Sequence, residues 1–264
     1  MAKGTYVSKN ISEAQLNLFK VLEEHEWDIF SLEQARAHFK DMFNDLESNL
    51  ENLVQKGLLS RLERGKYCKA GFRDENVIGT WLTPDGVVAY WSALNLHGLT
   101  DQFPNKVFIQ TTHKKSDKSV FGVEYRFVSL NTNKIAGTTT EGRGSHKFKI
   151  TDIEKTIIDC FDRPEYSGGY EELIKAFTHT LLVSDKLVKY SQLMGNKALI
   201  KRMGYLAELS ETATLNNFIA FARDQVNERY SLIDPFGENI GEFVNGWKIR
   251  LNIPKENLLR IVTK

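Results

Sequence analysis

The stretch from Phe30 to Ala70 constrains the fold more than any other part of the sequence. Ser31, followed three residues later by Gln34, forms a capping box, which predicts that a helix begins there. A second helix is predicted by apolar residues at helical spacing, and Gly57 is expected to end it. Residues 58–62 and 66–69 then predict two strands joined by a short turn that contains Gly65. Two helices followed by a hairpin predict a winged helix-turn-helix.

A fold of this kind most often places its second helix in the major groove of DNA. Here the face of that helix away from the core offers polar side chains, namely Asn44, Glu47, Ser48, Asn49, Asn52, Gln55 and Lys56. Asn and Gln can bind adenine edges bidentately, and Arg61, Arg64 and Lys66 on the hairpin can bind phosphates. Asp41, Asp45, Glu47 and Glu51 place negative charge on the same helix, which phosphates repel. A winged helix used only for protein contacts therefore stays open as an alternative.

Charge is balanced over the whole chain but not locally. The 35 basic and 34 acidic residues leave a formal net charge of +1, and residues 1–73 hold 11 of each kind. Residues 100–150, in contrast, hold nine basic and four acidic side chains. Lys147 and Lys149 alternate with apolar residues and so share one strand face. We therefore predict a second basic surface, with an ordinary solvated strand face as the alternative; its members are Lys114, Lys115, Lys118, Arg143, Lys147 and Lys149.

The length of 264 residues and the hydrophobic content of 41% allow two domains. We expect an α+β protein, with the winged helix-turn-helix in residues 1–73 and a larger mixed α/β domain in residues 74–264. A capping box at Ser12 and Gln15 predicts a further helix before the winged-helix motif, and Trp27–Phe30 can pair with the hairpin as a third strand. Residues 71–80 show no strong pattern and mark the expected boundary.

Beyond that boundary, antiparallel strands are expected first and helices afterwards. A helix is predicted over 87–96, strands over 106–110, 120–128 and 146–150, and a polar hairpin loop over 113–118. Thr151 and Glu154 suggest another capping box. Later helices are predicted to begin at Glu171 and to span 184–194, 196–209 and 214–225, and short strands to span 230–232 and 247–251.

No motif for a metal, a cofactor or a covalent nucleophile is present in the sequence. Cys68 and Cys160 are expected to be buried, reduced thiols, and the first ten residues lack the apolar segment of a signal peptide, so a cytoplasmic location is expected. One enzymatic alternative is a magnesium-dependent nuclease. Its carboxylates would come from Asp85 and Glu124 with Arg126, or from Asp152 and Glu154 with Lys155, although neither set has the usual order of such sites.

Three segments together resemble AbiEi-type antitoxins, which belong to type IV toxin–antitoxin and phage-resistance systems. The most specific is FKITDIEKTIIDCFDRPEYSGGYEE at residues 148–172; the others are WSALNLHGL at 91–99 and KRMGYL at 201–206. The likeness covers nearly the whole chain. Within the first segment, Asp159, Asp162 and Arg163 can be functional or architectural, and a buried Asp–Arg pair that locks a loop is the favoured interpretation.

The resemblance implies a function that composition and spacing do not. Proteins of that family are not enzymes: they repress their own operon by binding inverted repeats in the promoter. They also counteract a nucleotidyltransferase toxin without a tight complex, a role associated with the C-terminal domain. Carried onto this chain, the resemblance implies that double-stranded DNA is bound by the second helix, the hairpin and the basic strands. The candidate DNA-binding residues are Ser31, Gln34, Asn44, Ser48, Asn49, Asn52, Arg61, Arg64, Lys66, Lys114, Lys115, Lys118, Arg143, Lys147 and Lys149.

Overall fold

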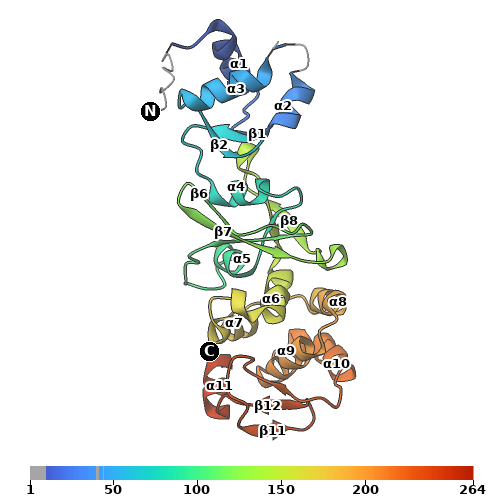
Figure 1. Cartoon of the computed structure of the whole chain (residues 1–264). Coiled ribbons are helices and arrows are strands. Elements are labelled where there is room, and N and C mark those ends of the chain that lie inside the picture. Colours follow the sequence, from blue (N-terminus) through green and yellow to red (C-terminus); the bar gives the residue numbers. More distant parts are fainter. Residues whose placement is uncertain (1–9, 40–41, 44, 264) are drawn as a thin grey trace.

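The computed structural model describes residues 10–39, 42–43 and 45–263. The chain forms an elongated molecule with three tiers (Figure 1). The amino-terminal module lies at one end, a six-stranded sheet occupies the middle, and a group of helices with a small sheet lies at the other end. The structure confirms the predicted α+β class, with amino-terminal helices and a hairpin followed by a larger α/β region.

The amino-terminal module is a winged helix-turn-helix. Its elements are α1 (Glu13–Glu24), β1 (Ile29–Ser31), α2 (Leu32–His38), α3 (Leu46–Gln55), β2 (Leu59–Glu63) and β3 (Lys66–Lys69). Both predicted capping boxes are present, and Gly57 has a φ of +74°, the left-handed conformation that ends a helix. The third strand is also confirmed, because β1 pairs with β3. Buried leucines of α1 and α3 pack with Phe30 and Tyr67 in a core of the module's own.

The middle tier is a mixed sheet in the order β6-β7-β5-β4-β9-β8. Its elements in chain order are α4 (Glu75–Trp81), β4 (Val87–Val88), α5 (Tyr90–Leu96), β5 (Val107–Thr111), β6 (Lys118–Val120), β7 (Val123–Ser129), β8 (Thr138–Glu141) and β9 (Phe148–Thr151). The β5–β7 and β4–β9 pairs are parallel and the other pairs are antiparallel. Helix α4 packs on β5, where Gly79 lies against Ile109 and Tyr125.

Several predictions for this tier were wrong. Residues 71–80 contain the start of α4, and the predicted helix over 87–96 begins only at Tyr90 because Val87 and Val88 pair with neighbouring strands. The expected strand over 120–128 is two strands joined by a tight turn. Since β5 and β7 are parallel, residues 113–118 connect β5 to β6 and are not the loop of a hairpin between the two predicted strands.

The third tier is mostly helical. It contains α6 (Ile153–Asp162), α7 (Tyr170–Thr178), α8 (Ser184–Met194), α9 (Lys197–Leu209), α10 (Asn216–Asp224), α11 (Lys255–Val262) and a small sheet of β10 (Ser231–Leu232), β12 (Ile249–Leu251) and β11 (Glu242–Val244). The capping box expected at Thr151 is wrong: Asp152 is the N-cap of α6 and accepts from the backbone N–H of Lys155. The Thr151 hydroxyl instead bonds that of Thr156.

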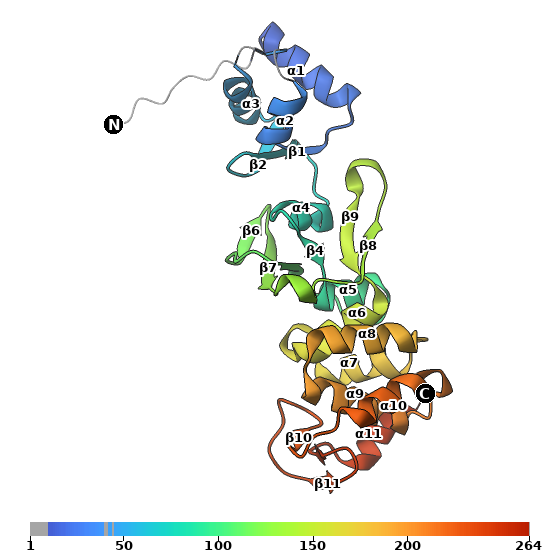
Figure 2. The same cartoon turned by 90° about the vertical axis from the view of Figure 1, so that its right-hand side faces the viewer.

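The amino-terminal module is joined to the middle tier by a shared core and by polar contacts. Ile29, Leu62 and Cys68 are buried in the same cluster as residues of α4, β5 and β9. The β8–β9 hairpin extends toward the module (Figure 2), where Ser145 hydrogen-bonds Asp28. Through these contacts the two parts share a hydrophobic core. The division of the chain into domains at residue 73 stays a prediction. Cys68 and Cys160 are both buried and free.

Candidate nucleic-acid interface

Helix α3, the expected recognition helix, has one buried and one open face. Leu46, Leu50 and Leu53 are buried, and the exposed positions are Glu47, Ser48 and Gln55. Asn49 and Asn52 are half-buried, and the Asn49 amide donates to the Asp45 carbonyl at 2.8 Å. Asn44 lies outside the described residues, and Lys56 is turned away, toward Gln15 of α1. Ser48, Asn52 and Gln55 are therefore the polar side chains left for an external partner.

Two of the four acidic side chains that argued against DNA binding are paired with arginines; Asp45 caps α3, and Asp41 lies outside the described residues. Glu47 forms an ion pair with Arg36 of α2 at 2.7 Å, and Glu51 forms one with Arg61 of β2 at 2.5 Å. The Tyr67 hydroxyl also donates to Glu51 at 2.7 Å. These contacts offset the negative charge of α3 where the helix faces the hairpin.

A groove runs between α2, α3 and the β2–β3 hairpin, which we call the wing groove. It is lined by Ser31, Leu32, Glu33, Arg36, Glu47, Arg61, Arg64, Gly65, Lys66 and Tyr67. Four of these side chains are basic and two are acidic. Arg64 is exposed and has no ion-pair partner in the part of the chain that the structure describes, so it is the cation most available to a phosphate.

Glu63 gathers three of the predicted DNA-binding lysines. Its carboxylate lies 2.8 Å from Lys66, 2.8 Å from Lys115 and 3.2 Å from Lys118. Burial alone would raise the pKa of Glu63, but the hydrogen bonds from Lys115 and Lys66 outweigh it and lower the pKa to about 2. Lys115 and Lys118, two members of the predicted basic surface, are therefore ion-paired with the wing.

A second groove, the waist cleft, separates the winged-helix module from the sheet. It has a volume of about 550 Å³ and is lined by Ser31, Glu33, Gln34, Lys66, Thr80, Trp81, Thr83, Pro84, Gly86, Thr140, Lys147, Phe148 and Lys149. The cleft thus brings together predicted residues from both parts of the chain. Ser31, Glu33 and Lys66 also line the wing groove, so the two grooves adjoin each other.

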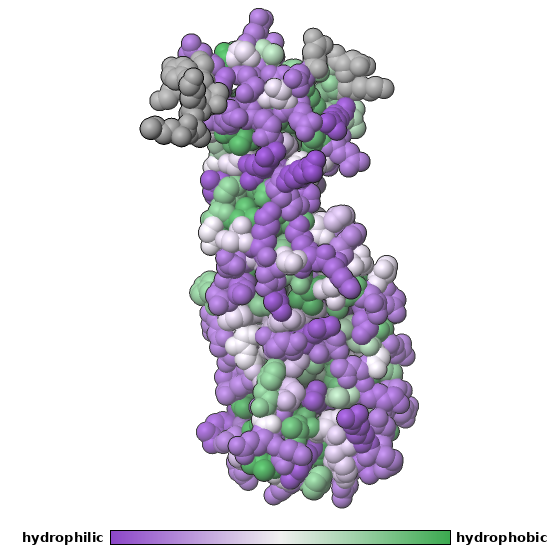
Figure 3. Space-filling view, viewed as in Figure 1, coloured by the Kyte–Doolittle hydropathy of each residue, from purple (hydrophilic) through white to green (hydrophobic). Residues whose placement is uncertain are grey.

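Ser31 and Gln34 keep donors that can face a ligand. Their side-chain oxygens accept from backbone N–H groups in the capping box, at 3.1 Å and 3.0 Å. The Ser31 hydroxyl hydrogen and the Gln34 amide N–H groups remain available, since neither is used by that motif. Figure 3 shows hydrophilic residues over much of the amino-terminal module, with a hydrophobic patch where the module meets the sheet.

The six predicted cations of residues 100–150 do not form one face. Lys118 lies on the edge strand β6, whereas Lys149 lies on β9, near the opposite edge of the sheet. Lys66 connects the two groups, because it shares Glu63 with Lys118 and shares the waist cleft with Lys149. Lys114 and Arg143 are exposed outside both grooves.

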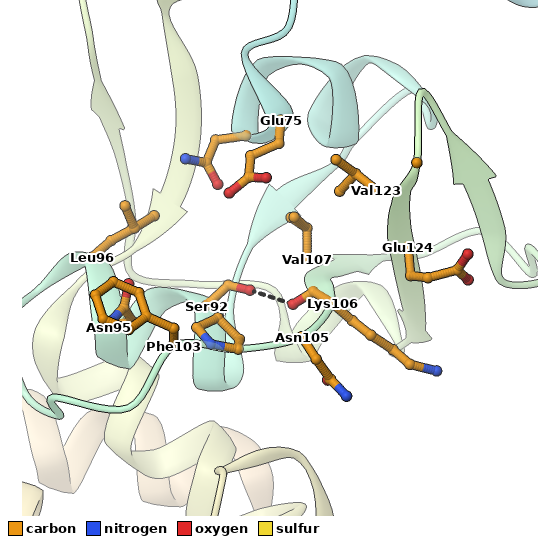
Figure 4. A pocket seen from close by; sticks show the side chains of 13 residues that line it. Glu75, Ser92, Asn95, Leu96, Phe103, Asn105, Lys106, Val107, Val123 and Glu124 are labelled. Carbon is orange, nitrogen blue, oxygen red and sulfur yellow. Dashed lines mark hydrogen bonds between the residues drawn. The ribbon is translucent and has the colours of Figure 1, made fainter.

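Neither carboxylate set of the nuclease alternative is gathered around an open site. Asp85 accepts from the Thr112 backbone N–H at 2.8 Å, beyond the end of β5, whereas Glu124 lies beside the start of β5. The length of β5 separates them by roughly 15 Å at the usual rise of a strand. Glu124 instead lines a pocket with Glu75 and Lys106, where its carboxylate points away from that of Glu75 (Figure 4). In the second set, Lys186 contacts both Asp152 and Glu154 at 3.1 Å.

The buried ion pair of α6 is not the expected Asp–Arg pair. Asp159 bonds Lys155, one turn away, and both side chains are fully buried. Burial raises the pKa of Asp159 above its usual range, and Lys155 opposes that shift. Asp162 accepts from Asn196, the N-cap of α9, at 2.8 Å. Both aspartates thus hold helices in place, which supports the architectural interpretation.

The comparisons with known proteins bear on the fold. No family model matches the sequence, and no curated protein does either. Among solved structures, that of the RV2827C protein from Mycobacterium tuberculosis is similar, with 15% sequence identity and a TM-score of 0.60. The alignment covers 97% of each chain, so the likeness extends over all three tiers. It shows a common fold.

Two residues that shape this interface were not found from the sequence. Arg36 lines the wing groove. Its position on the helix that begins at the predicted capping box is a signal that could have identified it. Glu63 had no such signal, because its partners Lys115 and Lys118 are more than 50 residues away. Among the described residues, no helix is long and apolar enough to cross a bilayer.

Proposed function

We propose that this chain is a DNA-binding autorepressor and antitoxin of a type IV toxin–antitoxin system, as its resemblance to AbiEi-type antitoxins implies. In this proposal the winged-helix module binds inverted repeats in the promoter of its own operon. The remainder of the chain counteracts a co-encoded nucleotidyltransferase toxin in the cytoplasm without a stable complex.

The open face of α3 beside the wing groove carries the DNA-binding part of the proposal. The open face of α3 offers Ser48, Asn52 and Gln55 next to a hairpin that presents the unpaired Arg64. A recognition helix flanked by a basic wing is the arrangement that inserts into a major groove while the wing binds the backbone. The ion pairs of Glu47 and Glu51 offset two of the four negative charges that argued against DNA binding.

Binding to the upstream DNA tests this part. Fluorescence anisotropy would compare a labelled duplex from the promoter with a scrambled duplex across a salt series. Arg64→Ala should weaken binding to both duplexes alike and lower the salt slope by about one, because it removes one phosphate contact. Lys255→Gln, an exposed cation of α11, is the matched control. Unchanged affinity of Arg64→Ala at every salt concentration would remove the wing from the interface.

Asn52→Ala tests base reading on the same duplexes. If the Asn52 amide binds a base edge, its loss should cost about 1–3 kcal/mol on the promoter and little on the scrambled duplex. Equal losses on both would contradict a reading role. A protein without affinity for either duplex at low salt would be a winged-helix adaptor for protein contacts.

The antitoxin part is tested on the full-length chain. Ile29, Leu62 and Cys68 share the core of the sheet, so removal of the winged-helix module would expose that core. We expect a full-length double variant, Arg61→Gln with Arg64→Gln, to lose promoter binding and still rescue cells that express the toxin gene. Loss of rescue by a folded double variant would link the two activities. Failure of the wild-type chain to rescue would refute the antitoxin role.

A further inference from the structure

A cleft in the third tier lies far from the winged-helix module, between the start of α9 and the small sheet (Figure 1). It has a volume of about 450 Å³, within the range of small-molecule sites. Eight of its nine lining residues have polar side chains; the nine are Asn196, Lys197, Ala198, Lys201, Arg202, Asn227, Arg229, Tyr230 and Ser231.

Positive charge is concentrated in this cleft without an acidic residue in its lining. Lys197, Lys201, Arg202 and Arg229 are its four cations. Across residues 10–39, 42–43 and 45–263, the ion pairs of the structure include none of these four side chains. In a chain with a formal net charge of +1, four unpaired cations around one cavity are an unusual concentration.

Lys201 forms the floor of the cleft and is 1% exposed. Its ammonium group donates to the Asn227 side-chain oxygen at 3.1 Å, to the Arg229 carbonyl, and weakly to the Lys248 carbonyl at 3.4 Å. All three acceptors are neutral. Burial lowers the pKa of Lys201, as do the charges of Arg202 and Arg229. Burying a cation without a counter-ion is costly, and a bound anion would offset that cost.

Other groups around the cleft favour the same kind of ligand. The Arg202 guanidinium is positioned by a hydrogen bond from its Nε to the Leu232 carbonyl at 2.8 Å, which leaves its terminal nitrogens available. Helix α9 begins at the cleft, so the positive end of its dipole lies there as well. Guanidinium groups suit phosphate oxygens because two parallel N–H donors match them.

We propose that this cleft binds a phosphorylated small molecule, with the phosphate held by Lys197, Arg202 and Arg229 above Lys201. The buried position of Lys201 favours a small ligand over a DNA backbone, because a convex duplex cannot reach the floor of the cleft. The Ser231 hydroxyl and the Asn227 amide N–H groups are placed to bind hydroxyl groups of the same molecule. The proposal is independent of the proposed promoter binding.

Isothermal titration calorimetry on the full chain tests the site, with inorganic phosphate, pyrophosphate and ATP as separate probes at constant ionic strength. We expect saturable one-to-one binding of at least one probe. Arg229→Gln should weaken it roughly tenfold, the effect of losing one charge-assisted contact. This variant keeps the backbone carbonyl that Lys201 bonds, and circular dichroism would verify its fold. Lys255→Gln is the control and should bind like the wild type.

Three results would overturn the proposal. The first is the absence of saturable binding by all three probes, and the second is equal binding by Arg229→Gln and wild type. The third is a roughly tenfold loss of affinity for a random-sequence duplex in Arg229→Gln, which would assign the cleft to a nucleic-acid backbone. Lys197→Gln, at an exposed position of the same rim, provides a second variant should Arg229→Gln not fold.

Discussion

Glu63 determines how much of the wing's positive charge can act on a ligand, because one carboxylate binds Lys66, Lys115 and Lys118. Glu63→Gln removes that counter-charge and should tighten binding to any duplex at low salt, with a steeper salt dependence. Anisotropy titrations would measure both. Glu24→Gln, an exposed acid of α1, is the control. Weaker binding by Glu63→Gln would mean that the wing needs this network in order to hold its position.

The same residue predicts a pH dependence of stability. The pKa of Glu63 is lowered from 4.5 to about 2, so its ion pairs stabilise the fold fully above pH 4.5. That contribution should be lost as the pH falls from 4.5 toward 2, because the carboxylate becomes protonated. Denaturant unfolding at pH 7 should show Glu63→Gln less stable by about 1 kcal/mol. The difference should shrink at pH 3, and a constant difference would contradict the ion-pair explanation.

The buried pair of Lys155 and Asp159 predicts a large effect from a single substitution. Lys155→Met leaves the Asp159 carboxylate buried without a cation, which should cost about 3–5 kcal/mol of unfolding free energy at pH 7. The cost should decrease at pH 5, where Asp159 takes up a proton more readily. The double variant Lys155→Met with Asp159→Leu should recover much of the loss. A double variant as unstable as the single one would show that packing, and not charge, is responsible.

At the scale of elements, Asp152 makes more contacts than an N-cap residue usually makes. Its carboxylate accepts from the Lys155 backbone N–H at 2.9 Å, from Lys186 at 3.1 Å and from the Tyr190 hydroxyl at 2.8 Å. Asp152→Ala should therefore destabilise the protein by about 2–3 kcal/mol, whereas Ser12→Ala, a cap of α1, should cost about 1 kcal/mol. Chemical denaturation compares the two, and equal losses would confine Asp152 to its role as a cap.

Which elements the sequence predicts depends on how local their determinants are. The capping boxes at Ser12 and Ser31 and the turn at Gly57 act within a few residues, and all three are present in the structure. Helix α4 has an N-cap, Asp74, but no capping box, because Val77 stands at the position where Glu or Gln would complete it. Its residues include Gly79. The need for a glycine at this position is apparent only in the folded structure, where the helix packs closely on Ile109 and Tyr125. The turn at Phe121–Gly122 was not predicted. Phe121 adopts a φ of +53°, and phenylalanine is not a residue type that indicates a positive φ.

The residues of the candidate site also divide into those with local determinants and those with long-range determinants. The positions of Asn52, Arg61 and Arg64 on the recognition helix and wing could be predicted from periodicity and turn spacing, because both are local. The ion pairs of Lys115 and Lys118 with Glu63 depend on how the wing packs against the sheet, and the partners lie in different tiers. Long-range pairing of this kind leaves no pattern in a single sequence.

At the scale of the whole molecule, the winged-helix module should unfold together with the sheet. Ile29, Leu62 and Cys68 are buried in the core of the middle tier, and Ser145 and His146 of the β8–β9 hairpin contact Asp28 and Asp74. Urea unfolding followed by tryptophan fluorescence and by far-ultraviolet circular dichroism should give coincident transitions. Two separate transitions by either probe would indicate a module that folds independently.

The three tiers follow one another along a single axis, with α1 at one pole and the small sheet of β10, β12 and β11 at the other (Figures 1 and 2). A duplex bound in the wing groove would contact the molecule near the α1 pole, and the small sheet would lie farthest from it. Each copy would then shield only a short footprint from nuclease digestion despite its size. A fluorophore or tether attached to the small sheet would report on the bound protein from a distance, without contacting the DNA.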